Sequence, residues 1–117
     1  MTKHKILPYL EHIIDAIKDI ESFARGLTKS KFLKNKLRQS AVIRQLEIIG
    51  EASKSLPGNF REKHSEVEWK KIAGTRDKIV HHYFGIDLNT VWDIVKKDLP
   101  ALKRKIIAIL KAEPKKE

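Results

Sequence analysis

The sequence predicts an all-α fold, an antiparallel bundle of four to five helices. Apolar residues recur at spacings of three and four along most of the 117-residue chain, as in helices that bury one face. No alternating apolar–polar run typical of a strand is present. Long helices with short connections favour antiparallel packing. We expect a single domain over residues 1–111 and a flexible basic tail over residues 112–117.

Two long helices are expected in the first half of the chain. The first covers about residues 3–26 and the second about residues 30–56, where Pro57 and Gly58 end it because they break the hydrogen-bond ladder. Gly50 lies in the middle of the second helix, where glycine costs about 1 kcal/mol relative to alanine. Close approach of another helix is the usual reason for such a glycine.

Shorter helices are expected next. A turn of helix around residues 60–64 precedes a short helix through Trp69, which the capping-box spacing of residues 65–68 would open. Gly74 interrupts, and Thr75 can cap a further helix that ends at Gly85.

The last helical run is expected to start after an Asp87 cap and to reach about residue 110. Pro100 should kink it or divide it at Asp98. Trp69 and Trp92 have the spacing of core residues, which predicts packing rather than base stacking.

Charge points to a polyanionic partner. The chain has 25 Lys and Arg against 15 Asp and Glu, a formal net charge of +10, and nucleic acid is the common partner of such a surplus. Solubility is the alternative explanation. Lys34, Lys36, Arg38 and Arg44 make the start of the second long helix basic, as a solvated face or as a track for phosphates.

Several classes of protein are disfavoured. The absence of cysteine removes disulfides, thiolate catalysis and cysteine-bound zinc. The histidines form no spaced ligand cluster, so we expect no metal and no cofactor. Charges interrupt the first twenty residues and no window approaches a membrane span, which predicts a soluble, cytoplasmic protein without a membrane partner.

The segment "TRDKIVHHYFGID", residues 75–87, is the best candidate for a site. At about 100° per residue, a helix would place Arg76 and His81 about 140° apart. It would place Asp77 and His81 on one face, and likewise Arg76 and Tyr83. The segment is either an ordinary polar stripe or a site in which a fixed cation suited to phosphate accompanies a group that titrates near neutrality.

Glu47 and Glu51 share a face of the second long helix and flank Gly50. Three roles are open to them from the sequence: exposure to solvent, pairing with the lysine surplus, or holding Arg76 in place.

The residues "RDKIVHHY" have the form R-x4-H-x-Y and resemble the signature of the HEPN superfamily, specifically of HepT-like toxins. The blocks "AVIRQLEIIGEA", "WKKIAGTRDKIVHHYFGID" and "VWDIVKKDLPALK" look like successive blocks of that family, in the same order. With the first helix included, the resemblance covers nearly all of residues 5–110.

The resemblance implies a HEPN-like bundle that forms a homodimer, with the signatures of both subunits lining a cleft. Active members are metal-independent endoribonucleases of toxin–antitoxin pairs. Their antitoxin is an MntA-like minimal nucleotidyltransferase that adds AMP to the signature tyrosine.

Carried to this chain, the resemblance makes Arg76 and His81 catalytic and Tyr83 the AMP acceptor. His81 would assist proton transfer at the ribose 2′-hydroxyl and Arg76 would hold the scissile phosphate, giving a 2′,3′-cyclic phosphate. Asp77, Glu47 and Glu51 would support the site. Asp77 stands where asparagine is more usual and adds a negative charge. The alternatives are a non-catalytic module that a partner nucleotidyltransferase binds and modifies, and a plain basic nucleic-acid binder.

Overall fold

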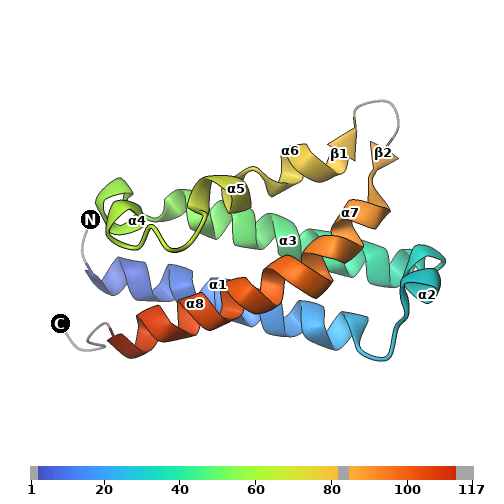
Figure 1. Ribbon diagram of the computed structural model, residues 1–117, viewed down its shortest axis with the longest axis horizontal. Coiled ribbons are helices and arrows are strands. Elements are labelled where there is room, and N and C mark those ends of the chain that lie inside the picture. The colour runs from blue at the N-terminus through green and yellow to red at the C-terminus, as the bar shows by residue number, and fades with distance from the viewer. Residues whose placement is uncertain (1–2, 82–84, 113–117) are drawn as a thin grey trace.

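The computed structural model describes residues 3–81 and 85–112, with the backbone alone at residues 3–5 and at His81 (Figure 1). Three long helical rods build the bundle. They are α1 (Lys3–Ala24), α3 (Lys36–Ser55) and a composite rod of α7 (Leu88–Asp93), the π-helix η2 (Ile94–Asp98) and α8 (Leu99–Ala112). α1 runs antiparallel to both α3 and α8 (Figure 1). This arrangement confirms the all-α, antiparallel expectation.

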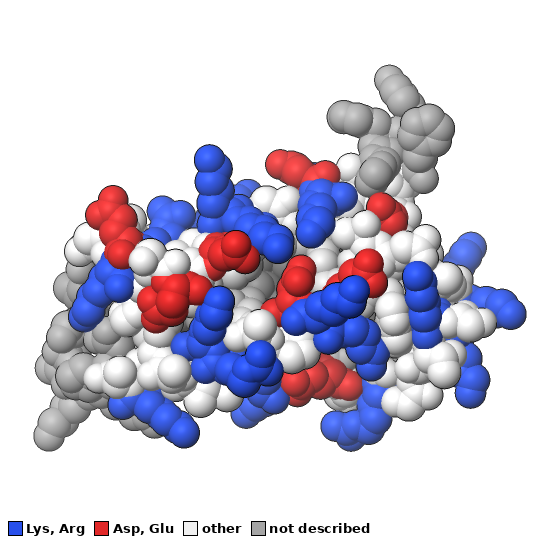
Figure 2. Space-filling model, viewed as in Figure 1, with Lys and Arg blue, Asp and Glu red and all other residues white. Residues whose placement is uncertain are grey.

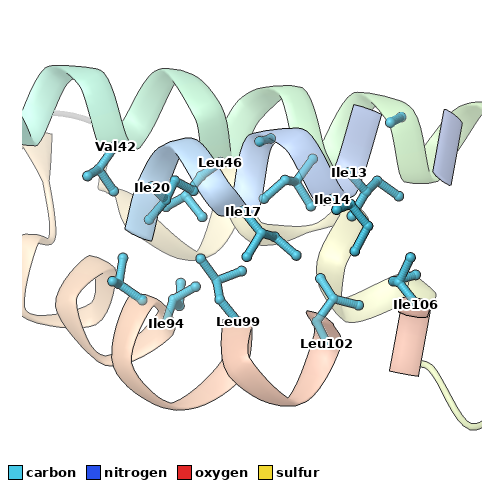
Figure 3. Close-up of a cluster of buried hydrophobic side chains, with 14 of the residues drawn as sticks. Ile13, Ile14, Ile17, Ile20, Val42, Leu46, Ile94, Leu99, Leu102 and Ile106 are labelled. Atoms are coloured by element: carbon cyan, nitrogen blue, oxygen red, sulfur yellow. The ribbon is translucent and has the colours of Figure 1, made fainter. Parts of the chain in front are cut away.

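The core lies between these three rods. Branched aliphatic side chains of α1 project between those of α3 and those of the composite rod (Figure 3). Each fully buried side chain of this kind contributes about 1.5–3 kcal/mol relative to an exposed one. The residues labelled in that view are Ile13, Ile14, Ile17, Ile20, Val42, Leu46, Ile94, Leu99, Leu102 and Ile106.

Both tryptophans are packing residues, as expected. Trp92 is buried, and its ring centroid is 5.1 Å from that of Phe32. Trp69 is buried 6.1 Å from the ring of Phe60, and its indole Nε1 donates a hydrogen bond to the carbonyl of His64 at 2.9 Å. The second contact satisfies the one polar atom of the indole, so its burial leaves no donor without a partner.

The second long helix is divided, contrary to the expectation of one helix over residues 30–56. A short α2 (Lys29–Leu33) precedes α3, and Asn35 begins α3 as its N-cap. The Asn35 Oδ1 accepts from the Arg38 backbone N–H at 3.0 Å, while Gln39 Nε2 donates to the carbonyl of Phe32 at 2.9 Å. These two bonds satisfy groups at the facing helix ends, which makes the break stable.

The connection after α3 is made of two short helices. α4 (Gly58–Lys63) corresponds to the expected turn of helix, and α5 (Trp69–Ala73) to the expected short one. The capping box is absent: Glu68 is the N-cap of α5 and makes no side-chain capping bond. α5 is instead held in place at its first residue, Trp69, whose ring is buried.

The α-helix is interrupted at Asp98, as expected, but a turn of π-helix makes the interruption and the chain stays helical. The Leu99 N–H donates to the carbonyl of Ile94, five residues earlier, which is the π-helical pattern. Pro100 supplies no N–H, and its ring crowds the preceding turn of an α-helix. A wider turn accommodates the proline without ending the helix.

The segment expected to be helical from Thr75 to Gly85 is helical only at its start. α6 covers Thr75–Ile79, and the chain then enters a small antiparallel ladder of β1 (Val80–His81) and β2 (Gly85–Ile86). Val80 pairs with Ile86, and His81 with Gly85. The two-residue ladder leaves the fold all-α in character.

Caps explain the ends of this segment. Thr75 is not the N-cap of α6, because Gly74 holds that position and the Thr75 Oγ1 donates to the carbonyl of Lys71 at 3.4 Å. Asp87 does cap α7, as expected: its Oδ1 accepts from the Thr90 N–H at 3.1 Å. The Asp87 N–H also donates to the Ile79 carbonyl at 2.7 Å, which ties the end of the ladder to the end of α6.

Candidate functional site

Gly50 sets the distance between α3 and the segment that carries Arg76. A Cβ at this position would lie 3.6 Å from the carbonyl oxygen of Ile72 and 3.7 Å from that of Ala73. The end of α5 therefore rests directly on α3 at Gly50, which confirms the close approach expected from a glycine in mid-helix. α6 follows after Gly74, so its first turn lies over the same stretch of α3.

Arg76 on α6 lies beside Glu47 on α3. The Arg76 Nε is 3.6 Å from the Glu47 Oε2, and the Arg44 Nη1 is 3.9 Å from the Glu47 Oε1. Glu47 thus stands between two guanidinium groups. The Arg76 side chain is 67% exposed and that of Glu47 36% exposed, so the pair is a surface ion pair of little net stability.

These side chains line a shallow groove across α3, which we call the α3 groove. One half of it contains Gly50, Lys54, Ala73 and Arg76, and the other half continues to Tyr9 and His12 of α1. Arg44, Glu47 and Glu51 belong to both halves.

The α3 groove contains two residues that the sequence pattern did not single out, Tyr9 and His12. Both lie on α1 where it packs beside α3, and only that packing could have found them.

The structure joins Glu47 to Arg76 but not Glu51. The ion pair of Glu51 is made with Lys54, at 4.0 Å, on the same helix. The structure therefore supports different roles for the two glutamates. Glu47 holds Arg76, and Glu51 pairs with a lysine.

The helical relationships predicted within "RDKIVHHY" do not hold. Because α6 ends at Ile79, the 140° separation of Arg76 and His81 and the shared face of Asp77 and His81 were wrong. β-Branched Ile79 and Val80 suit a strand as well as a helix, and Val80 has extended dihedral angles (φ −95°, ψ 121°). Asp77 is exposed on α6. The side chain of His81, and all of Tyr83, lie outside the described residues.

The four basic residues proposed to bind phosphates are distributed between two places. Lys34 and Lys36 are exposed at the junction of α2 and α3, whereas Arg44 is two turns further along α3, about 12 Å away at 1.5 Å per residue. Arg38 has a structural contact: its Nη1 donates to the carbonyl of Phe23 at 2.8 Å and fixes the end of α1. Only Arg44 is brought beside Arg76, through Glu47.

The described residues contain no group of three or more His, Asp or Glu side chains placed to hold a metal ion. Within the same part of the chain, no helix is both long enough and apolar enough to cross a bilayer.

Comparison with known proteins assigns the chain to a family. The family described as "Ribonuclease HepT-like" matches residues 13–109. The chain is 50% identical over 97 residues to a protein of Thermococcus cleftensis named "Probable ribonuclease HepT", an alignment that covers 83% of this chain and 88% of that protein. It is 44% identical over 106 residues to "Putative RNase TTE0752" of Caldanaerobacter subterraneus subsp. tengcongensis, with 91% and 95% covered.

A third relative is longer than this chain. "Gamma-glutamylcyclotransferase and putative RNase MJ0434" of Methanocaldococcus jannaschii is 47% identical over 102 residues, which cover 87% of this chain and 46% of that protein. The chain thus spans about half the length of this relative. No solved structure matches. Because the family match and the alignments extend over most of the chain, it belongs to the ribonuclease HepT-like family.

Proposed function

We propose that the protein is a metal-independent endoribonuclease of the toxin type, which cleaves RNA through Arg76 and His81. Membership of the ribonuclease HepT-like family supports the reaction class. The observation that carries the assignment to residues is the position of Arg76, a cation two-thirds exposed in the α3 groove and five residues before His81.

The proposed chemistry needs one base and one fixed cation. His81 removes the proton from a ribose 2′-hydroxyl, and the 2′-oxygen attacks the adjacent phosphorus. The bond from phosphorus to the 5′-oxygen breaks, and the leaving oxygen takes up a proton from water, giving a 2′,3′-cyclic phosphate and a 5′-hydroxyl. Arg76 would stabilise the negative charge that builds on the phosphoryl oxygens.

The pairing of Arg76 with Glu47 is compatible with this role. A surface ion pair contributes about 0–1 kcal/mol, so a phosphate can replace the Glu47 carboxylate at small cost. A guanidinium holds phosphate in a bidentate geometry that lysine cannot provide. Glu47 would thus orient Arg76 before RNA binds and release it afterwards.

Silencing would occur at Tyr83. The residue falls between β1 and β2 in the sequence, two positions after His81. Transfer of AMP to its hydroxyl, by an MntA-like nucleotidyltransferase, would add a bulky anion to the segment that carries the catalytic histidine. We further propose that two copies of the chain pair, so that the signatures of both subunits line one cleft.

The test is RNA cleavage by purified protein in the presence of a chelator, with product ends identified by mass. Wild type is compared with Arg76→Ala, His81→Ala and the control Arg104→Ala, which removes an exposed arginine of α8. We expect cyclic-phosphate ends from wild type and from the control, and a loss of at least about 100-fold in the other two variants. Equal cleavage by all four proteins would refute the assignment.

An inert wild type would favour the second reading, a non-catalytic module modified by a partner nucleotidyltransferase. Exposed Asp77 is the observation that favours it, because its negative charge is next to Arg76 in the sequence and opposes phosphate binding. Intact mass after incubation with such an enzyme and ATP would then show the addition of AMP, absent from Tyr83→Phe.

A further inference from the structure

A second concave site lies on the other side of α5 and α6 from the α3 groove. It is bounded by α5 and α6 on one side and by η2 and α8 on the other, and we call it the π-helix pocket. Its floor is aliphatic and includes the buried side chains of Leu46, Ile49, Val67 and Leu102. Figure 2 shows this face of the molecule, with a hollow among the charged side chains.

The rim of the π-helix pocket is predominantly basic. Lys71 and Lys78 stand on one side, and Lys97 and Lys105 on the other. Two carboxylates, Glu68 and Asp98, are also at the rim, and Glu68 is 3.8 Å from Lys71 in an ion pair. The four lysines outnumber the carboxylates, so the rim attracts a negatively charged occupant that presents apolar surface to the floor.

The size of the pocket limits the apolar part of that occupant. Its volume is about 130 Å³, close to the ~150 Å³ of an aliphatic cavity that holds one benzene. It therefore accepts one large aliphatic or aromatic side chain rather than a drug-sized ligand, for which pockets are about 300–1,000 Å³. Side chains that carry much of the binding energy at protein–protein interfaces are commonly seated in well-packed pockets.

Two other occupants fit less well. RNA bases are held by stacking on aromatic side chains and by hydrogen bonds to their edges, and none of the described residues that line the pocket is aromatic. A second copy of this chain has the same formal charge of +10, and so would meet a basic rim with a basic surface.

We propose that the π-helix pocket is a docking site for an acidic segment of another protein, anchored by one leucine, phenylalanine or tryptophan side chain. The π turn at Ile94–Asp98 contributes to the proposal because it places Ile94 in the floor and Lys97 and Asp98 at the rim. Single π turns of this kind occur frequently at functional sites.

The site is distinct from the α3 groove, although both are lined by Leu46 and by residues of the same short helices. Lys71, Thr75 and Lys78 face the π-helix pocket, while Ala73 and Arg76 face the α3 groove. A bound segment would thus contact α5 and α6 on the side of these helices that faces away from Arg76. The proposal does not rest on ribonuclease activity, and cleavage of RNA serves as an independent readout.

The experiment begins with a displayed library of short acidic peptides that carry one central leucine, phenylalanine or tryptophan, selected against the full chain. Selected peptides are then titrated against purified variants by fluorescence polarisation. Ala101→Trp fills the pocket, because Ala101 lines it, and Lys97→Glu with Lys105→Glu reverses two charges of the rim. The control is Lys111→Glu, an exposed lysine of α8 outside the pocket.

We expect binding that weakens by at least about tenfold in Ala101→Trp and in the double lysine variant, and that is unchanged in Lys111→Glu. Replacing the central apolar residue of the peptide by alanine should have the same effect. The double lysine variant changes only exposed residues, so it decides the question if Ala101→Trp fails to fold by circular dichroism.

Three results would overturn the proposal: no peptide is enriched, the selected peptides bind all variants equally, or the pocket variants lose binding of poly(U) RNA instead. The last result would reassign the pocket to RNA. Cleavage of RNA that is unchanged in the pocket variants would show that this site and the catalytic site are independent.

Discussion

Arg76 of α6 and Glu47 of α3 form an ion pair in which the Nε and Oε2 atoms are 3.6 Å apart. The same carboxylate lies 3.9 Å from Arg44, so one glutamate holds two arginines at the centre of the α3 groove. Both distances exceed hydrogen-bond length, and the side chains are substantially exposed. The contact is suited to orienting a guanidinium that, in the proposed reaction, exchanges its partner for a phosphate.

Glu47→Gln should therefore lower activity more than stability. Loss of the carboxylate leaves Arg76 free to adopt other rotamers, and we expect kcat/KM for RNA cleavage to fall by about 3–10-fold, as for a misoriented group. The free energy of unfolding should change by less than about 1 kcal/mol, because the pair is at the surface. Steady-state cleavage and urea denaturation measure the two quantities.

The matched control is Glu51→Gln, one turn further along α3, whose ion pair is with Lys54. It should leave kcat/KM unchanged within error. An increase in kcat/KM for Glu47→Gln, or an equal decrease in both variants, would contradict an orienting role specific to Glu47.

Gly50 provides a graded test of how α5 and α6 are positioned. A Cβ would make ordinary van der Waals contacts of 3.6 and 3.7 Å with the carbonyl oxygens of Ile72 and Ala73, so Gly50→Ala should fit. It should also raise the free energy of unfolding by up to about 1 kcal/mol, the helix propensity difference. Gly50→Leu has no room and should displace α5, lowering stability by about 1–3 kcal/mol and reducing cleavage.

Thermal unfolding and RNA cleavage of the two Gly50 variants provide the check. Alanine and leucine substitutions of equal effect would show that α5 does not rest on this part of α3.

The fold class could be predicted from the sequence because helical periodicity records which face of each long helix is buried. The positions at which helices end within an apolar pattern could not be predicted equally well. Asn35 lies within an apolar pattern that continues on both sides of it, and the bonds that stabilise the break involve Phe32 and Gln39. The end of α6 at Ile79 was missed because β-branched residues fit either structure, and pairing of Val80 with Ile86 decides between them.

Some residues of the candidate site could be predicted from the sequence, but their contacts could not. The signature named Arg76, and Gly50 marked the close approach of another helix. That Glu47, and not Glu51, would meet Arg76 depends on how α6 crosses α3, which periodicity does not fix. The structural role of Arg38 could not be predicted from the sequence, because its bond to the Phe23 carbonyl forms only when α1 and α3 pack.

Acid should weaken a contact in the segment that connects α4 to α5, between His64 and Glu66. The pKa of Glu66 is lowered by a hydrogen bond to its own backbone N–H and by His64, whose Nδ1 is 3.4 Å from the Glu66 Oε2, with a smaller effect of Lys105. A lowered folded-state pKa means that the stabilisation is complete above the ordinary value of 4.5 and is lost as the pH falls through the lowered one.

Glu66→Gln should accordingly have a lower Tm than wild type at pH values above 4.5, and the difference should shrink as the pH falls through the lowered folded-state pKa of Glu66. Glu62→Gln, an exposed glutamate of α4, serves as the control and should follow wild type throughout. A difference in Tm between Glu66→Gln and wild type that is independent of pH would show that the effect is not due to ionisation.

Gly85 lies opposite His81 and tests whether the ladder matters for cleavage. Its φ of +81° lies in the left-handed region, and its backbone pairs with that of His81 in the two-residue ladder. Gly85→Ala should lower the free energy of unfolding by about 1 kcal/mol, and should lower kcat/KM by about tenfold if the ladder positions His81, the proposed base. Gly85→Asn should retain more of both, because asparagine tolerates positive φ better than other residues.

Gly26 is the matched control, because it has a similar φ of +76° and lies in the turn after α1. Neither glycine has a heavy atom within 4 Å of an added Cβ, so the two alanine substitutions differ in location rather than in crowding. Gly26→Ala should show the same loss of stability by urea denaturation, with RNA cleavage unchanged at a temperature well below Tm. A parallel loss of cleavage in both variants would mean that activity follows global stability. A loss confined to Gly85→Ala would tie catalysis to the geometry of the ladder.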